Sequence, residues 1–320
     1  MRVDGSSVTA VTDSRGIFEL TVSAGSAFIT ASCQGYAPAT VALKTHGLQI
    51  YDINLKPRAT ELAEFVVKKK KYSKRNNPAV DFVNRLRRLG PASDPRRNDW
   101  YSYRTYERIS LGINNFDTVS TKGLLKRMPN LIEHVDTSEI SGEPVLNLSV
   151  HETAATTYYR KNPSSEKRIT EGVRTAGIDE LAEGDNVQTI LADLLRDVDL
   201  YQGNITLLKN TFVSPLSSLA PDFYRFYLVD SAAVIPGSDK PHVALAFYPR
   251  NKASMGFQGH LFVERGDTAM IVRRVEIAVS PEINLNFVKN LRLTQTFDVA
   301  DDGSRLKTSD RLLLDMQVLP

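Results

Sequence analysis

The C-terminal part of the chain carries six strand-like segments joined by short links, and this series constrains the fold more than any other feature. Each segment mixes β-branched, aromatic and polar residues in the alternation that half-buried strands show. Two links carry turn signals, Gly266-Asp267 and Asp302-Gly303. Strands that follow one another with short links predict one long antiparallel meander. The expected strands are residues 224–229, 243–248, 256–264, 270–279, 291–299 and 305–318.

A helix is expected well upstream of this meander, at about residues 77–90. Asn77 is a good N-cap residue, Pro78 suits the first helical position, and Gly90 followed by Pro91 ends the segment. The apolar residues fall at i, i+3, i+4 and i+7, so one stripe of the helix is expected to dock on a sheet. These residues are Ala79, Phe82, Val83 and Leu86.

Residues 100–113 predict a further strand that is rich in aromatic side chains. Tyr101 and Tyr103 share one face of this strand, while Trp100 and Tyr106 share the other. Such a ladder favours cross-strand packing, and binding of sugars or bases is the alternative. Another strand is expected over 145–150, and helices are expected near 121–128 and over 186–198.

The first 57 residues predict several short strands separated by turns. Phe18, Leu20 and Val22 alternate with polar residues, and a similar alternation follows later at Tyr51, Ile53 and Leu55. Regular short strands of this kind are typical of a small sandwich rather than a helical fold.

Residues 12–20, followed by Gln34-Gly35-Tyr36, resemble the carboxypeptidase regulatory-like domain. The resemblance implies a prealbumin-like β-sandwich that serves as a scaffold, because the peptidase chemistry of those proteins lies in a separate zinc domain. The first strand of that domain is missing here, so the sandwich is expected to be truncated. The natural start is then expected upstream of Met1, which would explain why no signal peptide is found.

The rest of the chain is similar to an uncharacterised family of Bacteroidota outer-membrane proteins, a domain of unknown function. In that family a carboxypeptidase regulatory-like domain precedes a periplasmic region and then a membrane β-barrel. The resemblance therefore implies a soluble, periplasmic or outer-membrane-associated portion without its barrel, with that barrel or cell-envelope proteins as partners. The matching segments are residues 72–80, 103–108, 152–163, 210–217, 223–228, 257–263 and 284–295.

These observations predict a mainly β, α+β chain in three parts. Residues 1–57 form the truncated sandwich, 58–75 a basic connection, and 76–320 a periplasmic domain built on a helix-supported antiparallel meander, as in lipoprotein carriers. The connection is basic enough to contact phosphate or an anionic lipid surface, although a solvated linker is the alternative. The candidate interaction surface is Lys68, Lys69, Lys70, Lys71, Tyr158 and Arg160.

No pattern in the sequence indicates catalysis, a cofactor or a metal. The net charge is only +3, and only residues 68–75 approach a basic stripe on one element, which argues against nucleic acid. The single cysteine, Cys33, excludes an internal disulfide. The chain contains no His-Glu-x-x-His, no Gly-x-Ser-x-Gly and no phosphate-binding glycine loop. The five histidines have no spacing that enforces a metal site; they are His46, His134, His151, His242 and His260.

The expected function is therefore a non-catalytic periplasmic scaffold or interaction region of an outer-membrane β-barrel protein. A periplasmic lipid or lipoprotein carrier is the alternative, and a weak hydrolase is a third hypothesis. A carrier needs an apolar concave face that is open to its ligand. A scaffold would fill the same face with its own elements, for example with the helix expected over 186–198.

Overall fold

The computed structural model describes most of the chain. The described residues are 72–114, 135–177, 198–235, 238, 240–280, 282, 283, 285 and 288–317, together with parts of the N-terminal region, namely 2–3, 10, 12, 17–22, 28–31, 39–44, 47 and 49–55. The chain separates into two compact units, residues 1–63 and residues 64–320.

The N-terminal unit contains a small antiparallel sheet of three strands, β1 (Arg2–Val3), β2 (Phe28–Ala31) and β3 (Ala39–Ala42). On β2, Ile29 and Ala31 are buried. The predicted strands at Phe18–Val22 and 51–55 are wrong, although their residues do alternate in exposure as expected. Alternation indicates which side chains are covered, whereas a strand also needs a neighbour for its backbone hydrogen bonds. Neither segment pairs with a strand within the described part of this unit. Residues 8, 9, 11 and 13–16 and Cys33 lie outside the described residues.

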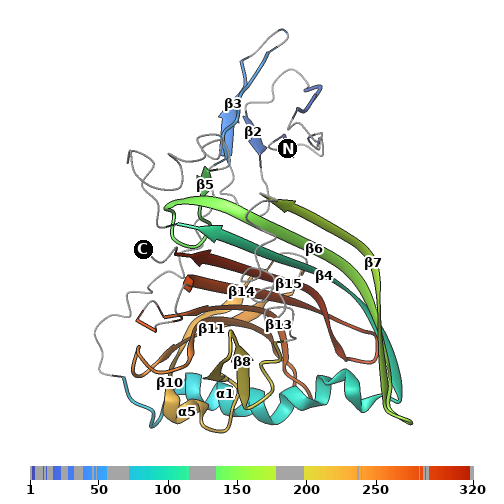
Figure 1. Ribbon diagram of the computed structural model, residues 1–320, viewed down its shortest axis with the longest axis vertical. Helices are drawn as coiled ribbons and strands as arrows, with labels where there is room; N and C mark the ends of the chain where they lie inside the picture. Colours follow the sequence, from blue (N-terminus) through green and yellow to red (C-terminus); the bar gives the residue numbers. More distant parts are fainter. Residues whose placement is uncertain are drawn as a thin grey trace. The chain divides into compact units, whose positions relative to one another are not determined.

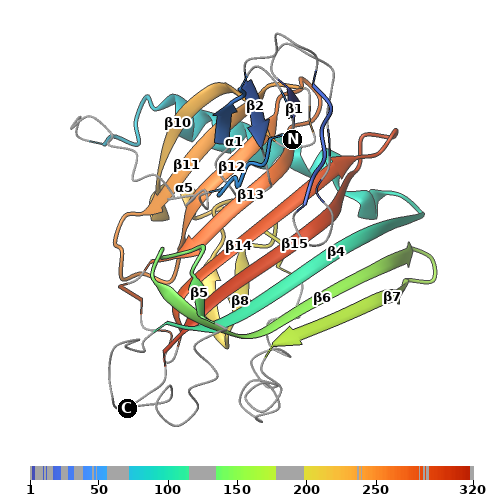
Figure 2. The same cartoon turned by 90° about the horizontal axis from the view of Figure 1, so that it is seen from above.

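The predicted meander is confirmed in the C-terminal unit, where six strands pair antiparallel in chain order. Figure 2 shows them side by side in orange and red. Their bounds are β10 (Tyr224–Ala233), β11 (His242–Pro249), β12 (Phe257–Glu264), β13 (Ile271–Val279), β14 (Val288–Val299) and β15 (Arg305–Met316).

The sheet does not stop at β15, and this continuation was not predicted. Strand β15 pairs in parallel with β4 (Trp100–Ile113), from Ser309 beside Tyr106 to Met316 beside Ile113. Strand β4 then pairs antiparallel with β6 (Pro144–Arg160), whose far side carries β7 (Ser165–Gly177) and, at its other end, β5 (Val135–Thr137). We call β4, β6 and β7 the ribbon. The whole sheet has ten strands.

The inner face of the sheet is covered by other elements of the same unit (Figure 1). Helix α1 (Pro78–Leu89) begins as predicted, because the Asn77 side chain accepts a hydrogen bond from the Ala79 amide at 2.9 Å. The other covering elements are α5 (Ala220–Phe223) and a hairpin of β8 (Asn204–Leu207) and β9 (Asn210–Val213). Two 3-10 turns, η1 (Gly90–Ser93) and η2 (Pro95–Arg97), lead from α1 into β4.

The covering elements and the sheet share one hydrophobic core. Leu86 of α1 and Phe212 of β9 are completely buried, and both belong to the same cluster as Leu245, Leu261 and Val275 of the meander. The rings of Phe212 and Phe257 stack with their centroids 4.7 Å apart. Apolar contacts therefore fill the inner face over the meander.

Two of the predicted helices lie outside the described residues, namely the one near 121–128 and all but the last residue of the one over 186–198. That last residue, Val198, is buried and not helical. Among the described residues, no helix has both the length and the apolar character needed to cross a bilayer.

Candidate functional site

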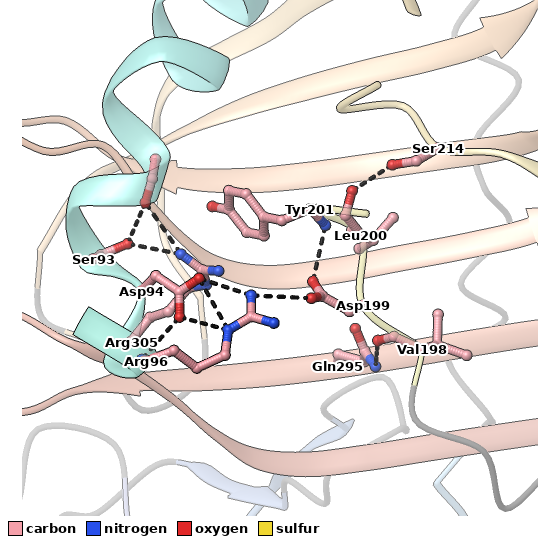
Figure 3. A network of polar contacts seen from close by, with 11 residues as sticks. Ser93, Asp94, Arg96, Val198, Asp199, Leu200, Tyr201, Ser214, Gln295 and Arg305 are labelled. Carbon is pink, nitrogen blue, oxygen red and sulfur yellow. Dashed lines mark hydrogen bonds and ion pairs between the residues drawn. The ribbon is translucent and has the colours of Figure 1, made fainter. Parts of the chain in front are cut away.

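A buried arginine at the start of β15 organises the point where the meander meets the ribbon. Arg305 is 6% exposed, and its guanidinium carbon lies 3.6 Å from the centre of the Tyr201 ring. Its Nη1 donates to the Gly90 carbonyl and to the Ser93 hydroxyl, each at 3.1 Å (Figure 3). A side chain on Gly90 would collide with the same tyrosine, since a Cβ there would lie 2.7 Å from the ring. One cation therefore joins the end of α1, the segment after 198 and strand β15.

Two aspartates lie near this arginine and pair with another one, Arg96. Asp94 accepts hydrogen bonds from Arg96 at both oxygens, with Nη2–Oδ2 at 2.7 Å. Arg96 Nη2 also lies 3.5 Å from Asp199 Oδ2. The other oxygen of Asp199 accepts a hydrogen bond from the Tyr201 backbone N–H at 2.9 Å. Burial would raise the pKa of Asp94, but the hydrogen bonds and charge of Arg96, with the charge of Arg305, outweigh it and lower the pKa. We call Ser93, Asp94, Arg96, Asp199, Tyr201 and Arg305 the Arg305 node.

A cavity of about 170 Å³ lies beside the node. Its wall includes Tyr101 and Tyr103 of β4, Lys307 of β15 and Glu166 of β7. Burial, with the nearby Tyr103 and Glu166, raises the pKa of Tyr101 to about 12, so this phenol stays neutral. The cavity is smaller than the roughly 300–1,000 Å³ typical of ligand pockets. Within the node Arg96 pairs with both aspartates and Arg305 donates to Gly90 and Ser93, which is the arrangement of a structural junction.

The outer face of the ribbon exposes aromatic and basic side chains together. Tyr158 and Arg160 were predicted as interaction residues, and both are exposed on the same face of β6. Directly opposite Arg160 on β4 lies Trp100, which is 78% exposed, and directly opposite Tyr158 on β7 lies Lys167. The structure thus brings residues from three strands into one patch, of which the sequence indicated two members.

The inner face of the ribbon shows the aromatic packing that the sequence predicted. The rings of Tyr101 on β4 and Tyr159 on β6 stack with their centroids 4.9 Å apart. The Tyr103 ring also stacks with Tyr101, with its centroid 6.1 Å from that of Tyr101. On the other face Trp100 and Tyr106 remain exposed, so the packing interpretation holds for one face of β4 only.

Ion pairs tie the three strands of the ribbon together along its middle. Arg168 of β7 reaches across β6 to Glu107 of β4 with two hydrogen bonds, of 2.8 and 2.6 Å. On the opposite face, Arg104 of β4 pairs with Glu171 of β7 at 2.7 Å. Each exposed pair contributes little to stability, but together they hold β7 in register.

The structure does not test the other four residues of the predicted surface, and it contains one ribbon strand that the sequence did not predict. Lys68, Lys69, Lys70 and Lys71 lie outside the described residues. Strand β7 was missed, because its 13 residues contain five charged side chains and lack the apolar alternation of a half-buried strand. The signal that could have found it is the turn at Lys161, Asn162 and Pro163, after which a hairpin partner for β6 is expected.

The described histidines lie apart from one another in the sheet. His151 is on β6, where Nδ1 lies 3.3 Å from the Thr175 hydroxyl; His242 is on β11 and His260 on β12. Glu264 pairs with Lys240 at 2.6 Å and with Arg273 at 2.9 Å. Within the described part of the chain, no group of three or more potential metal ligands forms. His46 and His134 lie outside it.

Comparison with known protein families gives one match. The model of DUF5686, a family of unknown function, matches residues 96–319. The matched range begins in η2 and includes the ribbon, the β8–β9 hairpin and the whole meander. No curated protein and no solved structure matches the chain.

Replacing Arg305 by methionine should destabilise the protein. The variant keeps an unbranched apolar stem but loses two charged hydrogen bonds and the stacking on Tyr201, so we expect a loss of about 2–4 kcal/mol in the free energy of unfolding. Urea unfolding followed by circular dichroism measures it. Arg160→Met, at an exposed position, is the matched control and should change stability by less than about 0.5 kcal/mol. Equal effects of the two substitutions would contradict the role given to the node.

His260 should make stability depend on pH. Burial lowers its pKa, and the charge of Glu276, which faces it from β13, only partly opposes this. The unfolded chain then binds more protons below pH ~6.5 than the folded chain, so stability is present above that pH and decreases as the pH falls. His242 shifts in the same direction. Unfolding curves between pH 7 and 5 should show a shallower decrease for His260→Gln than for the parent protein; an unchanged slope would contradict this.

Proposed function

This chain belongs to the DUF5686 family of unknown function, and from that premise we propose that it is a non-catalytic scaffold and interaction region of the bacterial cell envelope. In this proposal the meander and its covering elements form a rigid body, and that body presents the ribbon to other envelope components.

The observation that carries the proposal is that the chain fills its own inner face. Over the meander, the hairpin of β8 and β9 and helix α1 place Phe212, Leu207 and Leu86 against the sheet, all of them buried. Beside the ribbon, the cavity of about 170 Å³ is lined by residues of the Arg305 node together with apolar side chains. A face that is already packed supports a scaffold, because a ligand would have to displace native contacts.

The edge of the ribbon is the part that the scaffold presents. All 13 residues of β7 are exposed, and among the described residues no strand pairs with its outer side. The backbone N–H and C=O groups along such an edge can add a strand from a partner, with side-chain contacts supplying specificity. The ion pairs of Arg168 and Glu171 hold this edge in place before a partner arrives.

The cellular setting follows from the resemblances and belongs to the same proposal. The chain is the periplasmic portion of a Bacteroidota outer-membrane protein, and its membrane barrel or other envelope proteins are its partners. The same proposal makes residues 1–57 a prealbumin-like sandwich of the carboxypeptidase regulatory-like kind, and the small antiparallel sheet of β1, β2 and β3 supports this.

Photo-crosslinking along β7 tests the interaction role in source cells. A photoreactive amino acid at Ile169 or at Val173, both exposed on β7, should give a discrete crosslinked product with an envelope protein. The same group at Val234, which is 80% exposed beside β10, is the control and should give none. Products of equal yield from all three positions, or from none of them, would overturn the proposal.

A lipid or lipoprotein carrier is the second candidate, and one observation favours it. A groove of about 650 Å³ lies between α1 and the β12–β13 turn, with Phe82, Leu228 and Met270 in its apolar wall. That volume falls within the range of ligand pockets. Native mass spectrometry of the purified protein separates the two candidates. We expect the mass of the bare chain; a stoichiometric lipid that is lost from a Phe82→Asp variant would favour the carrier.

A further inference from the structure

We propose that the end of the ribbon is a contact site for an anionic lipid surface. This end consists of the first two rows of the outer face, Trp100 beside Arg160 and Tyr158 beside Lys167, together with Lys161 in the β6–β7 turn. The inference rests on the proposed function, because it names the partner of one part of the presented ribbon.

The side chains of this end alternate between rings and cations. Trp100 is 78% exposed and Tyr158 is 48% exposed, and each has a basic residue as its direct cross-strand neighbour. Large exposed rings on a sheet face that is otherwise polar are costly to hydrate unless a partner covers them. In Figure 1 the β6–β7 turn lies at the extremity of the ribbon, so these rows lie next to its outermost part.

The charges at this end differ from those in the middle of the ribbon. Arg104, Arg108 and Arg174 on the same face are each paired with a glutamate of another ribbon strand. By contrast, Arg160 and Lys167 form no ion pair within the part of the chain that the structure describes. The acidic neighbour of Lys167 in sequence, Glu166, faces the other side and lines the cavity beside the Arg305 node. Positive charge is therefore neutralised along the ribbon and left available at its end.

Rings interleaved with free cations match the chemistry of a membrane interface. Tryptophan and tyrosine place their amphipathic rings at the level of lipid headgroups, and lysine and arginine are attracted to anionic lipids. Single-stranded nucleic acid also favours rings and cations, but its binding sites are grooves that follow the backbone. Here the rings stand on an open sheet face and only two rows take part, which favours the flat surface of a bilayer.

The only tryptophan of the chain lies in this site, so its fluorescence reports on the site directly. The full chain is mixed with vesicles of phosphatidylcholine, with and without phosphatidylglycerol. We expect a blue shift of the Trp100 emission and co-sedimentation with the anionic vesicles only, both weakened by salt. One basic residue near an anionic surface strengthens binding by about fivefold. The double variant Arg160→Gln with Lys167→Gln should therefore bind the anionic vesicles about 25-fold more weakly than the parent protein.

The matched control replaces two exposed cations elsewhere in the sheet unit, Arg225→Gln with Lys252→Gln, and should bind as the parent does. Circular dichroism of each variant establishes that it is folded. Equal binding to neutral vesicles, no shift of the Trp100 emission, or equal losses in both double variants would each overturn the proposal. Tighter binding to a single-stranded oligonucleotide than to anionic vesicles would overturn the proposal in favour of a nucleic-acid site. Crosslinks from Ile169 do not depend on these outcomes, so failure here is distinguishable from failure of the interaction role.

Discussion

The buried guanidinium of Arg305 is the interaction on which the architecture of the sheet unit depends. It stacks on Tyr201 and donates to the end of α1, while standing at the first residue of β15. A buried cation is costly unless hydrogen bonds and nearby charges compensate it, and here Gly90, Ser93 and Asp94 do so. Three segments far apart in the chain must therefore meet correctly before this charge can be buried. That requirement favours the one arrangement in which β15 lies beside β4.

The pairing of β15 with β4 gives the sheet two regions with different properties. Over the meander, the inner face is apolar and is covered by the chain itself. Over the ribbon, the inner face carries tyrosines and paired charges, and the outer face carries exposed rings. Packing thus stabilises one region. In the other, among the residues that the structure describes, the outer edge of β7 has no strand partner and the cations at the end of the ribbon form no ion pair. The proposed functions belong to that second region because it has surface groups that the fold does not use.

Several features could be predicted from local sequence because they depend on neighbours in the chain. Asn77 and Pro78 determine where α1 begins, through a cap that spans two residues. The turns at Gly266 and Asp302 separate meander strands that pair in chain order. Tyr158 and Arg160 were named as candidate contacts, and they lie in a segment that carries the family resemblance. Strand β7 was missed because an edge strand exposed along its whole length carries no apolar pattern, and the turn at residues 161–163 was its only local signal.

By itself, then, the sequence determined the antiparallel meander, the start and end of α1 and the alternation of β4. Only the tertiary structure decided that β15 and β4 lie in parallel, that Trp100 faces solvent beside Arg160, and that the inner face is filled by β8, β9 and α1. The physical reason is the separation along the sequence of the residues that interact. Caps, turns and alternation arise from residues a few positions apart, whereas strand order and burial depend on contacts between segments separated by up to about two hundred residues, which no local pattern encodes.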